Sequence, residues 1–161
     1  MNKFIGTAGV VLGLGVAALW FAQNGAAQAQ VPLQPASADI AAGEALYATS
    51  CASCHGANLE GQPDWRSPGD DGKLRAPPHD KDGHTWHHGD ALLFNYTKLG
   101  GKAALAEQGM DFDSGMPGFS DSLTDVEIWN ILGYIKSTWP ERMREMQASR
   151  TESEQMQGNL E

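Results

Sequence analysis

The two cysteines of the chain lie three positions apart, and a histidine follows the second one directly. Residues 51–55 read Cys-Ala-Ser-Cys-His, which is the attachment motif of c-type haem. The thiols of Cys51 and Cys54 can each add across a vinyl group of the haem, and the imidazole of His55 can then bind the iron axially. Two thioether bonds and one ligand within so short a stretch predict a fold that is built around the ring.

Two other functions of a Cys-x-x-Cys pair fit this chain poorly. A thioredoxin-like redox pair lies in a βαβ pattern, whereas the residues around positions 51–55 favour a helix. A structural zinc site needs a second cysteine pair or a histidine pair at fixed spacing, and the chain has no other cysteine. We therefore predict one covalently attached haem c.

The sixth ligand of the iron is expected to be a methionine. Met116 stands in the run Gly-Met-Pro-Gly-Phe over residues 115–119. Proline fixes φ and glycine permits close approach of the backbone, so this stiff loop can hold one side chain over the ring. Met110 is a second candidate, but no proline follows it. Two alternatives stay open: a methionine that only fills a gap in the core, and a histidine ligand, His87 or His88.

A first helix is predicted over residues 39–54, where apolar side chains recur at helical spacing. Residues 56–89 are rich in Gly, Pro and Asp and keep no period, which predicts a long loop. A loop of this length in a compact domain is expected to cover a cofactor. Within it, residues 74–78 are expected to pass beneath the haem, where a backbone carbonyl can accept the N–H of His55.

Two further helices are predicted. One covers residues 91–99, with Asp90 as its cap and Gly100-Gly101 at its end. The other opens on the capping box Thr124-Asp125-Val126-Glu127 and carries an apolar stripe as far as Trp139, which a proline follows. No segment shows convincing strand alternation, so the predicted fold is all-α.

The first 29 residues have the form of an export signal. Lys3 precedes an apolar stretch over residues 4–21, and Ala27-Gln28-Ala29 has the small-x-small pattern of a cleavage site. A stretch of about 18 apolar residues is also close to the length that spans a bilayer, so an uncleaved membrane anchor is the alternative. We expect a periplasmic protein that is either soluble after cleavage or anchored to the inner membrane.

The rest of the chain divides into three parts. Residues 30–38 are predicted to be a linker, residues 39–139 the haem domain, and residues 140–161 a polar C-terminal tail with a helical turn or two. The formal net charge is −9, which argues against a nucleic-acid-binding surface. Basic protein partners are compatible with this charge.

The residues on either side of the motif resemble the class I cytochrome c family over about residues 39–139. Gly43 and Tyr47 precede the motif as they do in that family, where the glycine lets the first and last helices cross closely. Other matching positions follow in the family's order, namely His55-Gly56, Leu59, Gly61, Pro77-Pro78, Leu93, Gly100, Met116-Pro117-Gly118-Phe119, Leu123, Ile131 and Tyr134-Ile135. The resemblance implies helices packed around one covalent haem c with long haem-covering loops, ligation by His55 and Met116, and electron transfer.

One segment departs from the minimal pattern of this family. The histidines His79, His84, His87 and His88 lie within ten residues, together with Trp86, and the segment looks like a run found in a subset of bacterial monohaem cytochromes. It has three interpretations. It is a copper or zinc site, a packing and hydrogen-bonding element in which Trp86 and a histidine reach the haem propionates, or a solvated loop.

The predicted function is electron transfer without chemistry on a substrate, so the chain is not expected to be an enzyme. The iron alternates between two oxidation states while its ligands stay bound. The expected partners are redox proteins: a dehydrogenase or quinol-oxidising complex as donor, and an oxidase or reductase as acceptor. Two rival functions are a haem enzyme with an open sixth position, such as a peroxidase-like or sulfur-oxidising cytochrome, and the handling of copper or zinc by the histidines.

Overall fold

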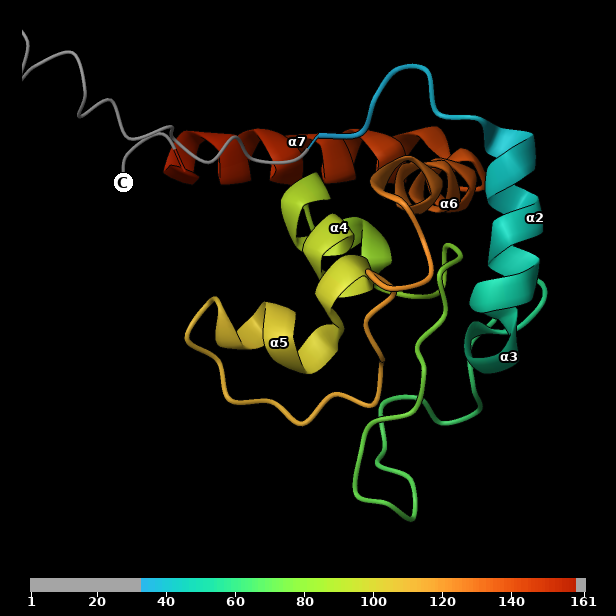
Figure 1. Cartoon of the computed structure of the whole chain (residues 1–161), viewed down its shortest axis with the longest axis vertical. Helices are drawn as coiled ribbons and strands as arrows, with labels where there is room; N and C mark the ends of the chain where they lie inside the picture. The colour runs from blue at the N-terminus through green and yellow to red at the C-terminus, as the bar shows by residue number, and fades with distance from the viewer. Residues whose placement is uncertain (1–32, 159–161) are drawn as a thin grey trace, which may run out of the picture. The chain divides into compact units, whose positions relative to one another are not determined.

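The computed structural model describes residues 33–158. The predicted export signal therefore lies outside the described residues. In the described part the chain is helical, with one isolated bridge between Pro68 and Leu74 and no strand (Figure 1). The helices are α2 (Ile40–Ser50), α3 (Ala52–His55), the 3-10 turn η1 (Thr85–His87), α4 (Asp90–Leu99), α5 (Gly101–Ala106), α6 (Asp125–Ser137) and α7 (Glu141–Gly158). The prediction of an all-α fold is confirmed.

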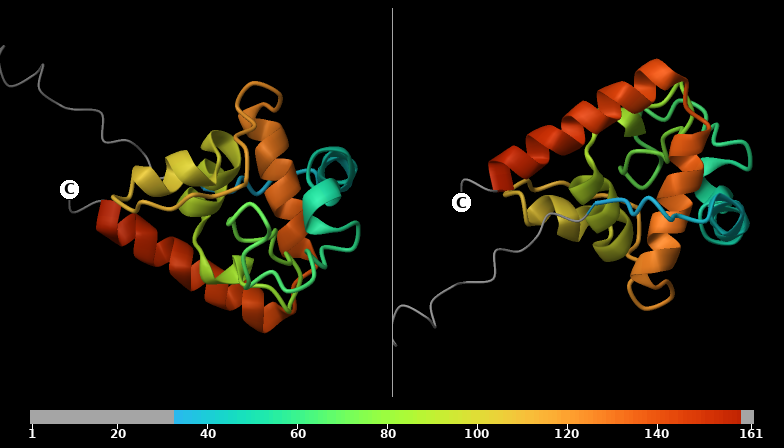
Figure 2. Two further views of the ribbon diagram at one scale, coloured as in Figure 1. Left: turned by 90° about the horizontal axis from the view of Figure 1, so that it is seen from below. Right: turned by 90° about the horizontal axis from the view of Figure 1, so that it is seen from above.

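Helices α2 and α6 pack against each other and form one side of the core (Figures 1 and 2). Gly43 lies at the contact, because a Cβ atom built there would be 2.0 Å from the carbonyl oxygen of Asn130. Tyr47 is fully buried beside Tyr134, with ring centroids 5.6 Å apart. Glycine at position 43 is thus required by the close approach of the two backbones, as the resemblance implied.

The first helix is interrupted just where the motif begins. The prediction of one helix over residues 39–54 is wrong in this detail: α2 ends at Ser50, Cys51 has a φ of −118°, and α3 then carries the rest of the motif to His55. Asp39 caps α2 by accepting a hydrogen bond from the N–H of Ala42 at 3.0 Å. The break falls at the first cysteine of the motif, and hydrophobic periodicity gives no signal for it.

The predicted second helix is present, but its ends differ from the expectation. Gly89, not Asp90, is the N-cap of α4, and Asp90 is the first helical residue with its carboxylate buried. Gly100 ends α4 with a φ of +86°, whereas Gly101 opens a further helix, α5, which was not predicted. The cap is misplaced because the acceptor for the first N–H groups of α4 comes from a distant residue, as described below.

The last predicted helix begins as expected. The side chain of Thr124 accepts from the N–H of Glu127, and the carboxylate of Glu127 accepts from the N–H of Thr124, so both halves of the capping box are present. Helix α6 ends at Ser137, earlier than predicted, and Trp139 lies buried beyond its end.

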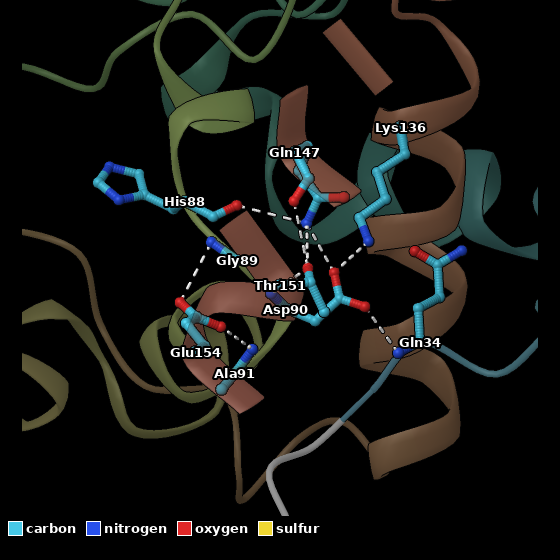
Figure 3. Close-up of polar contacts among 9 residues, drawn as sticks. All are labelled: Gln34, His88, Gly89, Asp90, Ala91, Lys136, Gln147, Thr151 and Glu154. Atoms are coloured by element: carbon cyan, nitrogen blue, oxygen red, sulfur yellow. Dashed lines mark hydrogen bonds and ion pairs between the residues drawn. The ribbon is translucent and has the colours of Figure 1, made fainter. Parts of the chain in front are cut away.

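The C-terminal stretch is a regular helix of 18 residues, not a tail with a turn or two. Strong helix formers fill α7, and no glycine or proline interrupts it before its last residue. Its buried side chains are Gln147 and Thr151, which are polar. The helix was missed because polar contacts with other segments hold it in place (Figure 3), so it has no apolar stripe to detect. Among the described helices, none has the length and hydropathy that a membrane-spanning segment requires.

The end of the predicted linker is docked on the helical domain. The N–H of Gln34 donates to the carboxylate of Asp90 at 2.9 Å, and the N–H of Asp39 donates to the side chain of Asn130 at 2.8 Å. The Cβ of Ala38 lies beside Gly133 of α6. Residues 34–38 therefore pack against the helical domain.

Candidate haem-binding site

His55 is held by the segment that was predicted to pass beneath the haem. Its Nδ1 lies 2.8 Å from the carbonyl oxygen of Pro77. A carbonyl can only accept, so Nδ1 carries the proton and the lone pair of Nε2 is left for a metal. Burial lowers the pKa of His55 and outweighs the opposing effect of this hydrogen bond. The ring is therefore a neutral imidazole of fixed tautomer, which is the form that binds iron, and the predicted carbonyl contact is confirmed.

A second imidazole lies directly against His55. The rings of His79 and His55 are stacked, with centroids 4.0 Å apart. The Nδ1 of His79 is 2.8 Å from the hydroxyl of Thr85, and its backbone carbonyl accepts from the indole N–H of Trp139 at 2.7 Å. The sequence placed His79 in the histidine block but gave it no role of its own. In the structure it is a packing neighbour of His55.

Both cysteines carry free thiols. Cys51 is buried and Cys54 is exposed, and they form no disulfide. Burial, together with the neighbouring Cys54, raises the pKa of the Cys51 thiol to about 11. No disulfide joins the two sulfur atoms, so both positions are compatible with thioether bonds to a haem. Their role as attachment points stays a prediction.

The loop that carries Met116 is fastened to the corner between α4 and α5. The carbonyl of Met116 accepts from the N–H of Gly101 at 3.1 Å, and the N–H of Phe119 donates to the carbonyl of Thr97 at 3.1 Å. Glycine is required at positions 100 and 118. A Cβ on Gly100 would lie 2.7 Å from the backbone nitrogen of Gly118, and a Cβ on Gly118 would lie 2.7 Å from the backbone of Leu99. Met116 is half-buried, whereas Met110 is exposed. The contacts tie the loop to α4 and α5, and the ligand role of Met116 stays a prediction.

The histidine block forms a stack of rings with a tryptophan from the preceding loop. The rings of Trp65 and His84 are stacked with centroids 5.2 Å apart, and His88 meets the edge of His84 at 5.3 Å. Arg66 lies over the Trp65 ring at 4.0 Å. No sequence signal singled out Trp65, because it stands alone in a loop without periodicity. This stacking shows that the block is a packed element rather than a solvated loop.

Two buried polar atoms in this block have no partner within the described residues. They are Nε1 of Trp86 and Nδ1 of His84. An indole N–H can only donate, so it calls for an acceptor such as a carboxylate. Buried polar atoms are normally paired, and a carboxylate of a haem would supply the acceptor that the indole N–H lacks. The residues present therefore fit a haem in chemistry: two thiols, one imidazole with a free lone pair, and an unpaired indole donor.

The metal-site interpretation of the histidine block finds no support. In the part of the chain that the structure describes, no group of three or more His, Cys, Asp or Glu side chains is arranged to hold a metal ion. His84 is instead packed between Trp65 and His88.

Comparison with known proteins agrees with this site. The profile of the family described as Cytochrome c matches residues 40–139, which is more than half of the chain. The chain belongs to the cytochrome c family, and it contains a haem-based electron-transfer domain with haem c as cofactor. The predicted family and its all-α fold are confirmed.

One curated relative carries a more specific name. The chain is 30% identical over 113 residues to a protein named thiosulfate dehydrogenase from Stutzerimonas stutzeri (strain A1501). The aligned region is 70% of this chain and 32% of the relative, so the chain spans about a third of the relative's length. The expectation that the chain is not an enzyme is corrected by this finding. A relative that shares most of this chain is named as an enzyme, so the domain alone does not distinguish a carrier from an enzyme.

Proposed function

We propose that this chain is a monohaem c-type cytochrome of the periplasm that exchanges single electrons with a redox enzyme. Cys51 and Cys54 hold the haem through thioether bonds, and His55 and Met116 bind its iron. When bound, the haem supplies a one-electron ferrous/ferric couple. The observation that supports the proposal best is the contact between His55 and Pro77, because it leaves Nε2 of a neutral imidazole free to bind.

The protein's own residues have three tasks in this function. The carbonyl of Pro77 orients the imidazole of His55, and the N–H groups of Gly101 and Phe119 fix the loop of Met116. The ring of His79 packs on the imidazole of His55 and covers one of its faces. A thioether ligand raises the reduction potential, and exclusion of water adds to its control.

The partner is proposed from the comparison. A relative named thiosulfate dehydrogenase suggests that the electrons come from a redox enzyme acting on a reduced sulfur compound. An oxidase or reductase is the matching acceptor. Contacts between electron-transfer proteins are small and dissociate quickly, so the partner surface needs no large apolar face.

A second candidate function is catalysis by this chain itself. The name of the relative favours it, and it requires that the sixth iron position be open or labile. In that case Met116 is not a firm ligand and thiosulfate delivers its electrons to this protein directly.

The ferric absorption spectrum distinguishes the two functions. A weak far-red band from a sulfur-to-iron bond in the haem-loaded wild type, lost in Met116→Ala but kept in Met110→Ala, supports ligation by Met116. Addition of thiosulfate to the oxidised wild type should then reduce it only when a redox enzyme is also present. A wild type without the band that thiosulfate reduces alone would establish the catalytic function instead.

Export is tested separately. Mass spectrometry of the protein purified from the periplasm should give a chain that begins at Gln30 and carries the added mass of one haem. A full-length chain in the membrane fraction would show that the leader is an anchor.

A further inference from the structure

Helix α7 lies beyond the part of the chain that matches the cytochrome c family, yet it packs on the histidine block. The match ends at residue 139, and α7 begins at Glu141. Its contacts are with η1 and α4. Three side chains of α7 make these contacts through hydrogen bonds (Figure 3), and we refer to Gln147, Thr151 and Glu154 together as the α7 clamp.

Glu154 caps α4 from a distance. Its carboxylate accepts from the N–H of Gly89 at 3.2 Å and from the N–H of Ala91 at 3.0 Å (Figure 3). Helix α4 has no capping side chain of its own, because its N-cap is a glycine. A carboxylate at the N-terminus of a helix satisfies unpaired N–H groups and interacts favourably with the helix dipole.

The capping contact leaves no room for a side chain at position 89. A Cβ atom on Gly89 would lie 2.3 Å from the carboxylate carbon of Glu154. Burial raises the pKa of Glu154, although the N–H groups of Gly89 and Ala91 oppose this. A partly buried carboxylate aimed at two backbone N–H groups is a specific contact and not a chance surface pair.

The other two residues of the clamp hold the next turn of chain. The side-chain amide of Gln147 lies 2.7 Å from a carboxylate oxygen of Asp90 and 3.3 Å from the carbonyl of His88. The hydroxyl of Thr151 accepts from the N–H of Asp90 at 3.1 Å. Gln147 and Thr151 are both buried. The clamp therefore binds every residue from His88 to Ala91.

The clamped residues are joined directly to the unpaired polar atoms of the histidine block. His88 follows η1, which carries Trp86, and His84 precedes η1. Consecutive Cα atoms are about 3.8 Å apart, so a shift at Gly89 moves Trp86 unless the loop deforms. Nε1 of Trp86 and Nδ1 of His84 are the buried atoms without a partner, and the indole N–H of Trp86 calls for an acceptor.

We propose that Glu154 is a positioning residue for the haem edge, because its cap on α4 fixes η1 and so holds the indole N–H of Trp86 in place, where it would be a donor to a carboxylate of the haem. This inference rests on the proposed function, in which the chain binds a haem through His55. N–H groups near a carboxylate offset its negative charge, and less negative charge near the iron favours the ferrous state. Loosening the clamp should therefore lower the midpoint reduction potential.

The test is a redox titration of the haem-loaded protein in wild type, Glu154→Ala and Glu152→Ala. Glu152 is exposed on the same helix, so its variant controls for the loss of one negative charge. We expect a lower midpoint potential in Glu154→Ala and a smaller decrease in Glu154→Gln, which keeps one acceptor oxygen. Removing the charge of Glu152 should raise the potential slightly or leave it unchanged, so the decrease expected in Glu154→Ala is not explained by the loss of a negative charge.

Thermal unfolding of the same variants separates positioning from mere stabilisation. A lower melting temperature with an unchanged potential in both Glu154→Ala and Glu154→Gln would overturn the inference. Trp86→Phe removes the donor itself and provides the reference. If the potential falls in Trp86→Phe but not in the Glu154 variants, the role of Glu154 is contradicted and the proposed function is not. If the wild type fails to retain haem, the proposed function itself is contradicted. Glu154→Gln is the variant to rely on if Glu154→Ala does not fold.

Discussion

The imidazole of His79 stacks on the imidazole of His55, with ring centroids 4.0 Å apart and planes inclined by 25°. A second contact holds the same ring: the carbonyl of Pro77 accepts the Nδ1 proton of His55 at 2.8 Å. The ring of His55 is therefore restrained both by a hydrogen bond in its plane and by a neighbour on its face. The hydrogen bond sets the tautomer, and we infer that the stacking sets the rotation of the ring about its bond to the chain.

Replacing His79 by leucine tests this restraint. His79→Leu removes both the stack and the contact with Thr85, so we expect the haem to stay attached while the rotation of the His55 ring changes. The g-values of the ferric protein in electron paramagnetic resonance report that rotation. The lost hydrogen bond should also lower the free energy of unfolding by about 1 kcal/mol.

Thr85→Val is the matched control, because it removes the contact with the Nδ1 of His79 but leaves the two rings in place. It should cost similar stability and change the g-values much less. Identical spectra in wild type and His79→Leu would mean that the carbonyl of Pro77 orients the ring without help.

Gly43→Ala should weaken the crossing of α2 and α6. The added Cβ would lie 2.0 Å from the carbonyl oxygen of Asn130, which is helix backbone and cannot turn aside. Overpacking at such a contact costs about 1–3 kcal/mol, and chemical denaturation of the haem-loaded protein measures it.

Gly69→Ala serves as the comparison for Gly43→Ala. Its added Cβ would meet a side-chain oxygen of Asp71 at 3.2 Å, and that side chain can move. We expect a change of less than about 0.5 kcal/mol, as for ordinary surface substitutions. Equal stability losses in the two variants would show that the helix crossing is not the cause.

Local signals in the sequence were sufficient for the elements whose determinants are neighbours in the chain. The capping box of Thr124 and Glu127 lies within four residues, and it predicts the start of α6 correctly. The motif at residues 51–55 is likewise local, and it led to the correct family. The carbonyl of Pro77 could be anticipated because a ligand histidine needs an acceptor and the loop had to pass beneath it.

The features that sequence reasoning missed depend on residues far apart in the chain. The start of α4 was assigned to Asp90 because a carboxylate there looks like a cap, whereas the carboxylate that caps it belongs to Glu154. Helix α7 buries Gln147 through hydrogen bonds to His88 and Asp90, and no hydrophobic period reveals that. The stacking of Trp65 on His84 could not be predicted either, because nothing in the sequence indicates that these two residues meet.

His88 should make the protein less stable in mild acid. Burial, with added repulsion from His84, His87 and Arg150, lowers the pKa of His88 to about 4. The unfolded chain binds the proton near the ordinary pKa of 6.5, so the free energy of unfolding falls as the pH falls from about 6.5 to 4. The loss is about 2 kcal/mol once the partial exposure of the ring is allowed for.

His88→Gln removes the titrating group and should give a flatter dependence of stability on pH in this range. Urea denaturation at pH 7, 5.5 and 4 measures it. Nuclear magnetic resonance of the reduced protein gives the pKa of the His88 ring itself. A ring that titrates near its ordinary value would contradict the prediction, whatever the denaturation curves show.

Asp90 should be the most costly charged residue to replace. Burial raises its pKa, but the ion pair with Lys136 and the hydrogen bonds from Gln34 and Gln147 outweigh burial and lower the pKa below its ordinary value of 3.8 (Figure 3). Asp90→Asn leaves the largely buried ammonium of Lys136, whose side chain is 14% exposed, without its counter-charge. Removing one partner of a buried pair costs about 3–5 kcal/mol, and we expect this loss in urea denaturation at pH 7.

The effect of acid distinguishes the charge of Asp90 from its size. A carboxylate whose pKa is depressed in the folded state stabilises the protein above the ordinary pKa and ceases to do so as the pH falls through the folded value. The difference in stability between wild type and Asp90→Asn should therefore be largest at pH 7 and should become smaller below about pH 3.8.

Lys136→Met is the matched variant. It leaves Asp90 with hydrogen bonds from Gln34 and Gln147, so it should cost less than Asp90→Asn at pH 7. The reverse order would show that an unpaired carboxylate at position 90 costs more than an unpaired ammonium at position 136, in spite of the hydrogen bonds to Asp90.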